Sequence, residues 1–172
     1  MRKLIGRGVA LAAMLLAIWL GHSQLRKTSP GYNFFFTPED LYSNLASSPF
    51  DLTKAGYSAK LHFSSKYPGN HWVALIVDKP AQHFPNYGSD FSVKVTIRKN
   101  GTVIAESIAK TSNLWFHGRH GKSGFALATF KVPEHWAVDD NLVATAKVLK
   151  ASPFFQEKYG EQTLVVEKYS DE

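Results

Sequence analysis

The feature that most constrains the fold is an alternation of apolar and polar residues along short segments of the chain. Between positions 91 and 98, Phe, Val, Val and Ile alternate with Ser, Lys, Thr and Arg, so an extended segment here would have one apolar side and one polar side. Asn100-Gly101 follows directly, and this dipeptide favours the backbone conformations of a two-residue hairpin turn. The pattern therefore predicts an antiparallel hairpin with its return strand over residues 102–109.

Similar segments recur along the rest of the chain. Residues 57–63 alternate in the same way, and residues 72–77 (WVALIV) are continuously apolar, as expected for a strand buried on both faces. Further strands are predicted over residues 114–117, 124–132, 142–149 and 163–169. About eight short strands, with no long helices alternating between them, predict a mainly β fold. The expected architecture is an antiparallel β-sandwich of the Ig-like or C2-like kind.

One short helix is predicted near residues 38–46, before the strands begin. Thr37 suits a helix N-cap, and Pro38 suits the first helical position. Leu41 and Leu45 are four residues apart, which would give the helix an apolar side.

The N-terminal segment has the pattern of a targeting sequence. Arg2, Lys3 and Arg7 accompany an unbroken apolar run over residues 9–20, which is typical of a secretory signal peptide. A cut after Ser23 would remove this run, and we prefer this alternative. If the run is retained, it would be an N-terminal membrane anchor, although a bilayer core requires about 20 apolar residues.

These patterns predict a simple organisation. Residues 1–27 would be the signal peptide or membrane anchor, residues 28–33 a linker, and residues 34–172 a single β-sandwich domain. Both alternatives for the leader export the domain, so we expect a periplasmic protein or one anchored in the inner membrane and facing the periplasm. The sequence contains no cysteine, which excludes disulfides, a lipid-bearing cysteine and thiolate sites, and fits a bacterial envelope.

The charge of the chain is concentrated in the leader. The formal net charge is +6, but residues 1–27 hold five of the 20 Lys and Arg and no acid. The remaining 15 nearly balance the 14 Asp and Glu. The domain itself is therefore close to neutral, which disfavours nucleic-acid binding.

The stretch WFHGRHGKSGF, residues 115–125, is the most distinctive in the chain. Gly121-Lys122-Ser123 resembles the end of a phosphate-binding loop, but Phe116 stands where that motif requires its first glycine. The residues after Ser123 also predict a strand instead of the helix that such a loop precedes. The spacing and the context therefore both argue against a nucleotide site.

The same stretch is the candidate binding site. His117, Arg119, His120 and Lys122 lie among glycines, in a span without acids, and would bind an anion or an acidic partner. The alternative is a charged hairpin tip in solvent. No metal or cofactor is predicted, because zinc requires three or four ligands and only two histidines occur here. A metal site completed by distant ligands remains open.

Two other constellations offer alternatives. His135 with Asp139 or Asp140 has the residue types of acid–base catalysis, but no nucleophile motif accompanies them. Asp139-Asp140-Asn141 lacks the spaced acids of a calcium loop and predicts a turn. The aromatic residues that a sugar-stacking platform could use are Tyr67, Trp72, Phe84, Tyr87, Trp115 and Trp136. Most of these, and Trp72 above all, are expected to pack in the core.

Together these observations favour a binding module. An exported, all-β domain without a catalytic motif suits a protein that binds another protein, such as an adaptor or a toxin-neutralising protein. A module for a glycan or an anionic ligand is the first alternative. A hydrolase that uses His135 with Asp139 or Asp140 is the second.

Overall fold

The computed structural model describes residues 14–22, 39–79, 90–110, 115–117, 122–136 and 140–169. The chain divides into two compact units, Met1–Leu41 and Tyr42–Glu172. In the first unit, residues 14–22 are helical. Within the described ranges, no helix has both the length and the apolar character needed to cross a bilayer.

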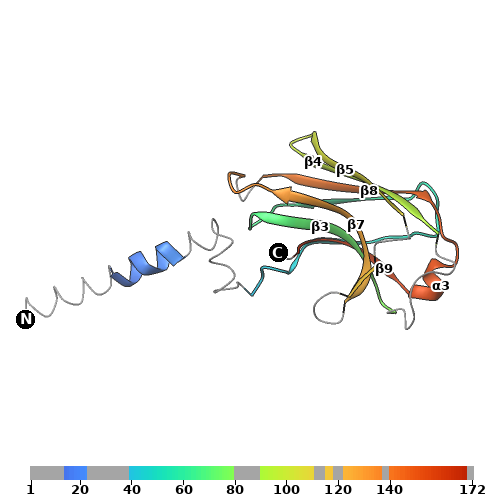
Figure 1. The fold of residues 1–172 in the computed structure, drawn as a ribbon, viewed down its shortest axis with the longest axis horizontal. Helices are drawn as coiled ribbons and strands as arrows, with labels where there is room; N and C mark the ends of the chain where they lie inside the picture. Colours follow the sequence, from blue (N-terminus) through green and yellow to red (C-terminus); the bar gives the residue numbers. More distant parts are fainter. Residues whose placement is uncertain are drawn as a thin grey trace, which may run out of the picture. The chain divides into compact units, whose positions relative to one another are not determined.

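The second unit is a sandwich of two antiparallel sheets (Figure 1). The five-stranded sheet has the order β1-β9-β3-β7-β6, and the four-stranded sheet has the order β2-β8-β4-β5. The strands are β1 (Asn44–Pro49), β2 (Ser58–Phe63), β3 (Gly69–Val77), β4 (Ser92–Lys99), β5 (Thr102–Lys110), β6 (Trp115–His117), β7 (Ser123–Val132), β8 (Leu142–Lys150) and β9 (Gln162–Lys168). The predicted fold class is confirmed, and each predicted strand corresponds to one of β2 to β9.

The predicted helix over residues 38–46 is wrong. Residues 39–42 form turns, and Asn44–Pro49 is strand β1, which pairs with β9 so that Ser47 lies opposite Val165. A short isolated helix is marginal in water, whereas β1 gains a ladder of hydrogen bonds along the edge of β9. In the described part of this unit, the helix is α3 (Phe155–Tyr159), which the sequence did not indicate.

The hairpin predicted at Asn100-Gly101 is confirmed. Both residues have positive φ, 49° at Asn100 and 85° at Gly101, as a two-residue type I′ turn requires. The turn joins β4 to β5, and the two strands pair from Ser92↔Lys110 to Lys99↔Thr102. The turn sets the register of the first two pairs, and a shift between Ile97 and Arg98 changes it by one residue along the rest of the hairpin.

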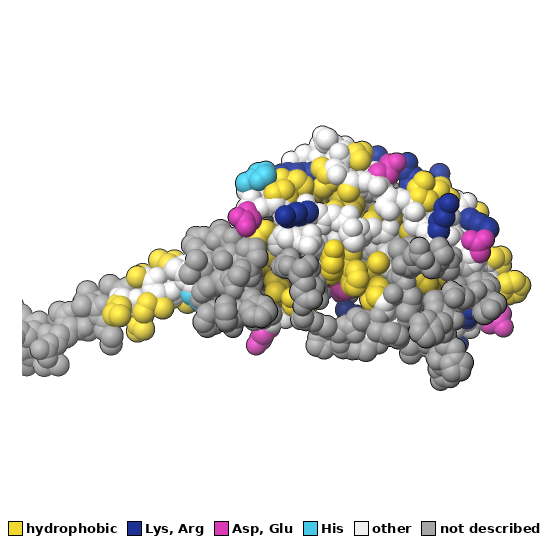
Figure 2. Space-filling view, viewed as in Figure 1, with side chains coloured by type: hydrophobic (Ala, Val, Ile, Leu, Met, Phe, Trp, Pro, Cys, Tyr) yellow, Lys and Arg dark blue, Asp and Glu magenta, His cyan; other side chains and the backbone are white. Residues whose placement is uncertain are grey.

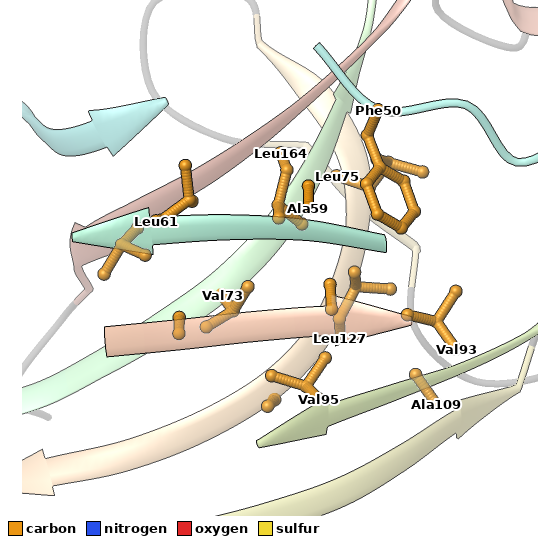
Figure 3. Close-up of a cluster of buried hydrophobic side chains, with 14 of the residues drawn as sticks. Phe50, Ala59, Leu61, Val73, Leu75, Val93, Val95, Ala109, Leu127 and Leu164 are labelled. Atoms are coloured by element: carbon orange, nitrogen blue, oxygen red, sulfur yellow. The ribbon is translucent and has the colours of Figure 1, made fainter. Parts of the chain in front are cut away.

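The core lies between the two sheets and is built mainly from alternate residues of β2, β3, β4, β7, β8 and β9. In β4, Val93, Val95 and Ile97 are fully buried. Figure 3 shows Leu61 and Leu164, from opposite sheets, among the side chains that fill the space between the strands. The side chains that alternate with these point outward, so each sheet also presents an outer face.

Candidate functional site

The predicted binding loop is described only in part. His117 ends β6 and pairs with Ser123 in β7; its side chain lies outside the described residues, as do Arg119 and His120. Lys122 is described, and its side chain is not free in solvent. Its Nζ donates a hydrogen bond to Asn44 Oδ1 at 3.0 Å and lies 3.5 Å from Glu167 Oε2.

Glu167 connects Lys122 to an aromatic side chain. Trp72 and Glu167 lie directly opposite each other on β3 and β9, and Trp72 Nε1 donates a hydrogen bond to Glu167 Oε1 at 3.0 Å. The Glu167 side chain is only 11% exposed. Lys122 and Trp72 together compensate the cost of removing this carboxylate from water.

The Trp72 ring contacts two further aromatic rings, those of Phe116 and Tyr169, and we call these three rings the aromatic platform. The Trp72 ring lies 4.4 Å from the ring of Phe116 in β6, and 5.3 Å from the ring of Tyr169, which follows β9. The Trp72 and Tyr169 rings are stacked, with an interplanar angle of 21°. All three side chains are half-buried, and none belongs to the core cluster.

The position of Trp72 corrects the expectation that it packs in the core. Its neighbours His71 and Val73 face inward and are buried, so Trp72 faces outward by the alternation of a strand. Residues 72–77 are therefore not buried on both faces, since Trp72 and Ile76 are partly exposed. Trp136 does pack against the core. Of the other aromatic candidates, Phe84, Tyr87 and the side chain of Trp115 lie outside the described residues.

The structure describes two of the three residues suggested for a hydrolase, His135 and Asp140, and gives them different surroundings. Asp140 Oδ2 lies 2.6 Å from Lys99 Nζ, and that same ammonium lies 4.1 Å from the centre of the Trp136 ring. His135 is exposed in the turn after β7, and Asp139 lies outside the described residues. Asp140 thus has a cationic partner. In the described ranges, no group of three or more His, Asp or Glu is arranged to hold a metal ion.

A serine–histidine pair that the sequence did not indicate lies inside the sandwich. Ser65 Oγ is 2.9 Å from His71 Nε2, and His71 Nδ1 is 3.0 Å from the carbonyl oxygen of Gly69. A carbonyl only accepts, so His71 Nδ1 donates its proton to Gly69. This is the spacing of a nucleophile and its base. The one sequence signal is that His71 alternates in phase with core residues of β3.

Burial assigns this pair a structural role. Ser65 is 7% exposed and His71 is 1% exposed, so a substrate in solvent has no access to the hydroxyl. Ser65 Oγ also donates to the carbonyl oxygen of Tyr67 at 2.8 Å. Ser65 therefore binds a backbone carbonyl of the connection between β2 and β3, and His71 binds the carbonyl at the start of β3, so the two side chains hold the conformation of this segment.

Ser65→Ala is expected to lower the free energy of unfolding by about 1–3 kcal/mol, because it leaves His71 Nε2 buried without its hydroxyl partner. Urea denaturation followed by circular dichroism measures this. The matched control is Ser64→Ala at the exposed neighbouring serine, with an expected change within about 0.5 kcal/mol. Equal effects of the two substitutions would contradict the assigned role.

Comparisons with known proteins add a similarity of fold. No protein-family model matches the chain, and no curated protein matches it. The chain is similar to a protein from Sulfurospirillum deleyianum of known crystal structure, with 12% identity, 72% of this chain and 96% of that chain covered, and a TM-score of 0.48. A similarity at this level carries no argument about function.

Proposed function

We propose that the protein is an exported binding module of the cell envelope and that it binds another protein through the aromatic platform. The observation that carries the proposal is the position of Trp72, between Phe116 and Tyr169 on the outer face of the five-stranded sheet. The core is complete without these rings. Aromatic side chains are enriched at protein interfaces, where they bury a large area with few rotatable bonds.

The polar neighbours of the platform support the same function. The hydrogen bond to Glu167 holds the Trp72 indole in one orientation, and a side chain that is already ordered loses less conformational entropy when a partner binds. Lys122 and Glu167 place opposite charges at the edge of the platform. Charges at such a rim select and orient a partner more than they add to affinity.

Export is supported by the composition of residues 1–27, with its early cations and the apolar run over residues 9–20. We propose that the domain is periplasmic, or anchored in the inner membrane and facing the periplasm. An adaptor or a toxin-neutralising protein would belong to this class.

Site-specific photo-crosslinking tests the proposed protein partner. Benzoylphenylalanine in place of Phe116, in the full chain expressed in the envelope, is expected to give one discrete adduct with another protein. The adduct should disappear when Trp72→Ala is added and should weaken with Trp72→Phe, which keeps a ring but loses the hydrogen bond to Glu167. Benzoylphenylalanine in place of Phe154, which is 70% exposed and directly precedes α3, is the control position. No adduct at Phe116, or the same adducts at both positions, would reject the proposal.

A glycan ligand is the second candidate, because the stacked Trp72 and Tyr169 rings lie beside the Glu167 carboxylate. Flat aromatic faces bind apolar faces, and a nearby carboxylate accepts hydrogen bonds from hydroxyl groups. Titration with soluble peptidoglycan fragments, followed by tryptophan fluorescence, would show a saturable change that Trp72→Ala abolishes. A fluorescence change that is the same in Trp72→Ala and the original protein would reject this candidate.

A further inference from the structure

The outer face of the four-stranded sheet carries a surplus of positive charge. In β4 the inward residues are apolar, and Lys94 and Arg98 alternate with them on the outer side. Lys60 in β2 and Lys147 in β8 occupy the same outer side, since their neighbours on either side along the strand are buried or face the core. We call Lys60, Lys94, Arg98 and Lys147 the basic face. Three adjacent strands of the sheet contribute to it.

The acids do not balance this face. Glu106 in β5 is the one acid in the sequences of the four strands, and it forms an ion pair with Lys94 at 2.9 Å. The hydrogen bond from Lys94 is the main reason that the pKa of Glu106 is below its ordinary value. Arg98 adds a weaker electrostatic contribution to the lowered pKa of Glu106. In the described part of the chain, Lys60 and Lys147 have no ion pair with an acid.

Two of these cations are placed against each other. Lys94 and Lys147 lie directly opposite on the paired strands β4 and β8, an arrangement that destabilises a sheet relative to opposite charges. The domain as a whole is close to neutral, so the surplus is a local segregation of charge. Figure 2 shows Lys and Arg side chains along the upper rim of the molecule, where Figure 1 places β4, β5 and β8.

Exposed aliphatic side chains lie among the cations. Ile108 in β5 is 54% exposed and lies opposite Lys94, and Val103 is 48% exposed and lies opposite Arg98. The outer side of the edge strand β5 therefore combines aliphatic groups with the cations of β4. Amphipathic helices that lie at the headgroup level of a bilayer combine these two kinds of side chain, and this face of the sheet has the same combination.

We propose that the basic face docks on an anionic phospholipid bilayer, with its cations at the headgroup phosphates and with Val103 and Ile108 at the edge of the contact. The face is built from the pleated surface of a sheet, and its charges are spread over three strands, which suits an extended anionic surface. If the leader, residues 1–27, is retained as an anchor, it also brings the chain to a membrane. The proposal is independent of the aromatic platform, because the two surfaces belong to the outer faces of different sheets. Together they would allow the domain to hold a partner with one sheet and rest on a membrane with the other.

Partition of the full chain between buffer and vesicles tests the proposal. The apolar leader is the same in every variant, so the quantity compared is the ratio of partition into phosphatidylglycerol vesicles to partition into phosphatidylcholine vesicles. The double substitution Lys60→Gln with Lys147→Gln is expected to lower this ratio about 30-fold, since each cation near an anionic surface contributes about 1 kcal/mol. Added salt should also lower this partition ratio for the protein without substitutions, because salt screens the attraction between the cations and the phosphates.

The matched control removes the same charge elsewhere. Lys131→Gln with Lys158→Gln changes two exposed lysines on β7 and α3 and should leave the ratio nearly unchanged. Thermal unfolding shows whether the variants fold. Lys147→Gln should keep or raise the melting temperature, because it removes the like-charge contact with Lys94. A loss of binding would then not come from unfolding.

A second measurement uses the protein without substitutions: its lysines are acetylated chemically, and mass spectrometry measures how strongly each one reacts. Phosphatidylglycerol vesicles, and not phosphatidylcholine vesicles, should protect Lys60, Lys94 and Lys147, and the reactivity of Lys131 and Lys158 should not change. An equal fall of the partition ratio in both double variants would overturn the proposal. So would the absence of protection by phosphatidylglycerol vesicles, including a case in which an acidic protein protects these lysines instead.

Discussion

Phe155→Ala is expected to lower the free energy of unfolding by about 3–5 kcal/mol, as truncation of a fully buried aromatic side chain does. Phe155 is 0% exposed. Its ring centre lies 5.6 Å from that of Phe91, 5.5 Å from that of Phe125 and 4.6 Å from that of Tyr159. Removal of the ring opens a cavity among Phe91, next to β4, Phe125 in β7 and Tyr159 in α3. Because all three are fully buried, they have little room to move into the cavity.

The neighbouring phenylalanine is the control. Phe154 is 70% exposed, so Phe154→Ala should change the free energy of unfolding by less than about 0.5 kcal/mol. Urea denaturation of both variants, followed by tryptophan fluorescence and circular dichroism, gives the comparison. Similar losses of unfolding free energy at the two positions would contradict the burial of the Phe155 ring in the core.

Gly124→Ala is expected to have an effect of similar size, a loss of about 3 kcal/mol or more. A Cβ added at Gly124 would lie 2.0 Å from the carbonyl oxygen of Leu75 and 2.9 Å from its carbonyl carbon. These are backbone atoms of β3, the strand paired with β7 at this point. Backbone in the centre of a sheet cannot move aside without breaking its own ladder, so β7 itself must shift.

This shift would also reach the aromatic platform, because Gly124 pairs with Phe116 on its other side. Near-ultraviolet circular dichroism should therefore change together with stability. Gly56→Ala is the control: Gly56 has φ of 80°, but an added Cβ meets nothing within 4 Å. Its expected loss of about 1 kcal/mol reflects backbone strain alone. If Gly124→Ala lowers the free energy of unfolding no more than Gly56→Ala does, then β3 does not exclude a methyl group at position 124.

Much of the fold could be predicted because strand patterns are local. The alternation in residues 91–98 and the turn at Asn100-Gly101 are contained in about ten residues, and each predicted strand has a counterpart in the structure. The prediction failed at β1, where helix signals at Thr37 and Pro38 competed with pairing to β9. That pairing joins segments near opposite ends of the chain, and no local pattern announces it.

Of the residues that form the candidate site, the sequence predicted only Lys122. Lys122 belongs to the loop that the sequence indicates, but its contacts Asn44 and Glu167 come from β1 and β9. No local pattern in the sequence indicates that β1 and β9 lie in the same sheet as β7. That arrangement follows from the strand order β1-β9-β3-β7-β6 of the folded domain. The assignment of Trp72 to the core failed for a related reason. An apolar run does not show which of its side chains face outward.

The sequence by itself determined that this chain forms strands, and in the alternating segments it determined which side of each strand is apolar. Those properties depend on neighbouring residues, because successive side chains of a strand point to opposite faces. Only the tertiary structure decided what the outer faces contain. A face is assembled from alternate residues of strands whose order in the sheet depends on distant pairings. Strand order therefore placed Trp72 beside Glu167 and gathered on one face cations that the nearly neutral composition of the domain conceals.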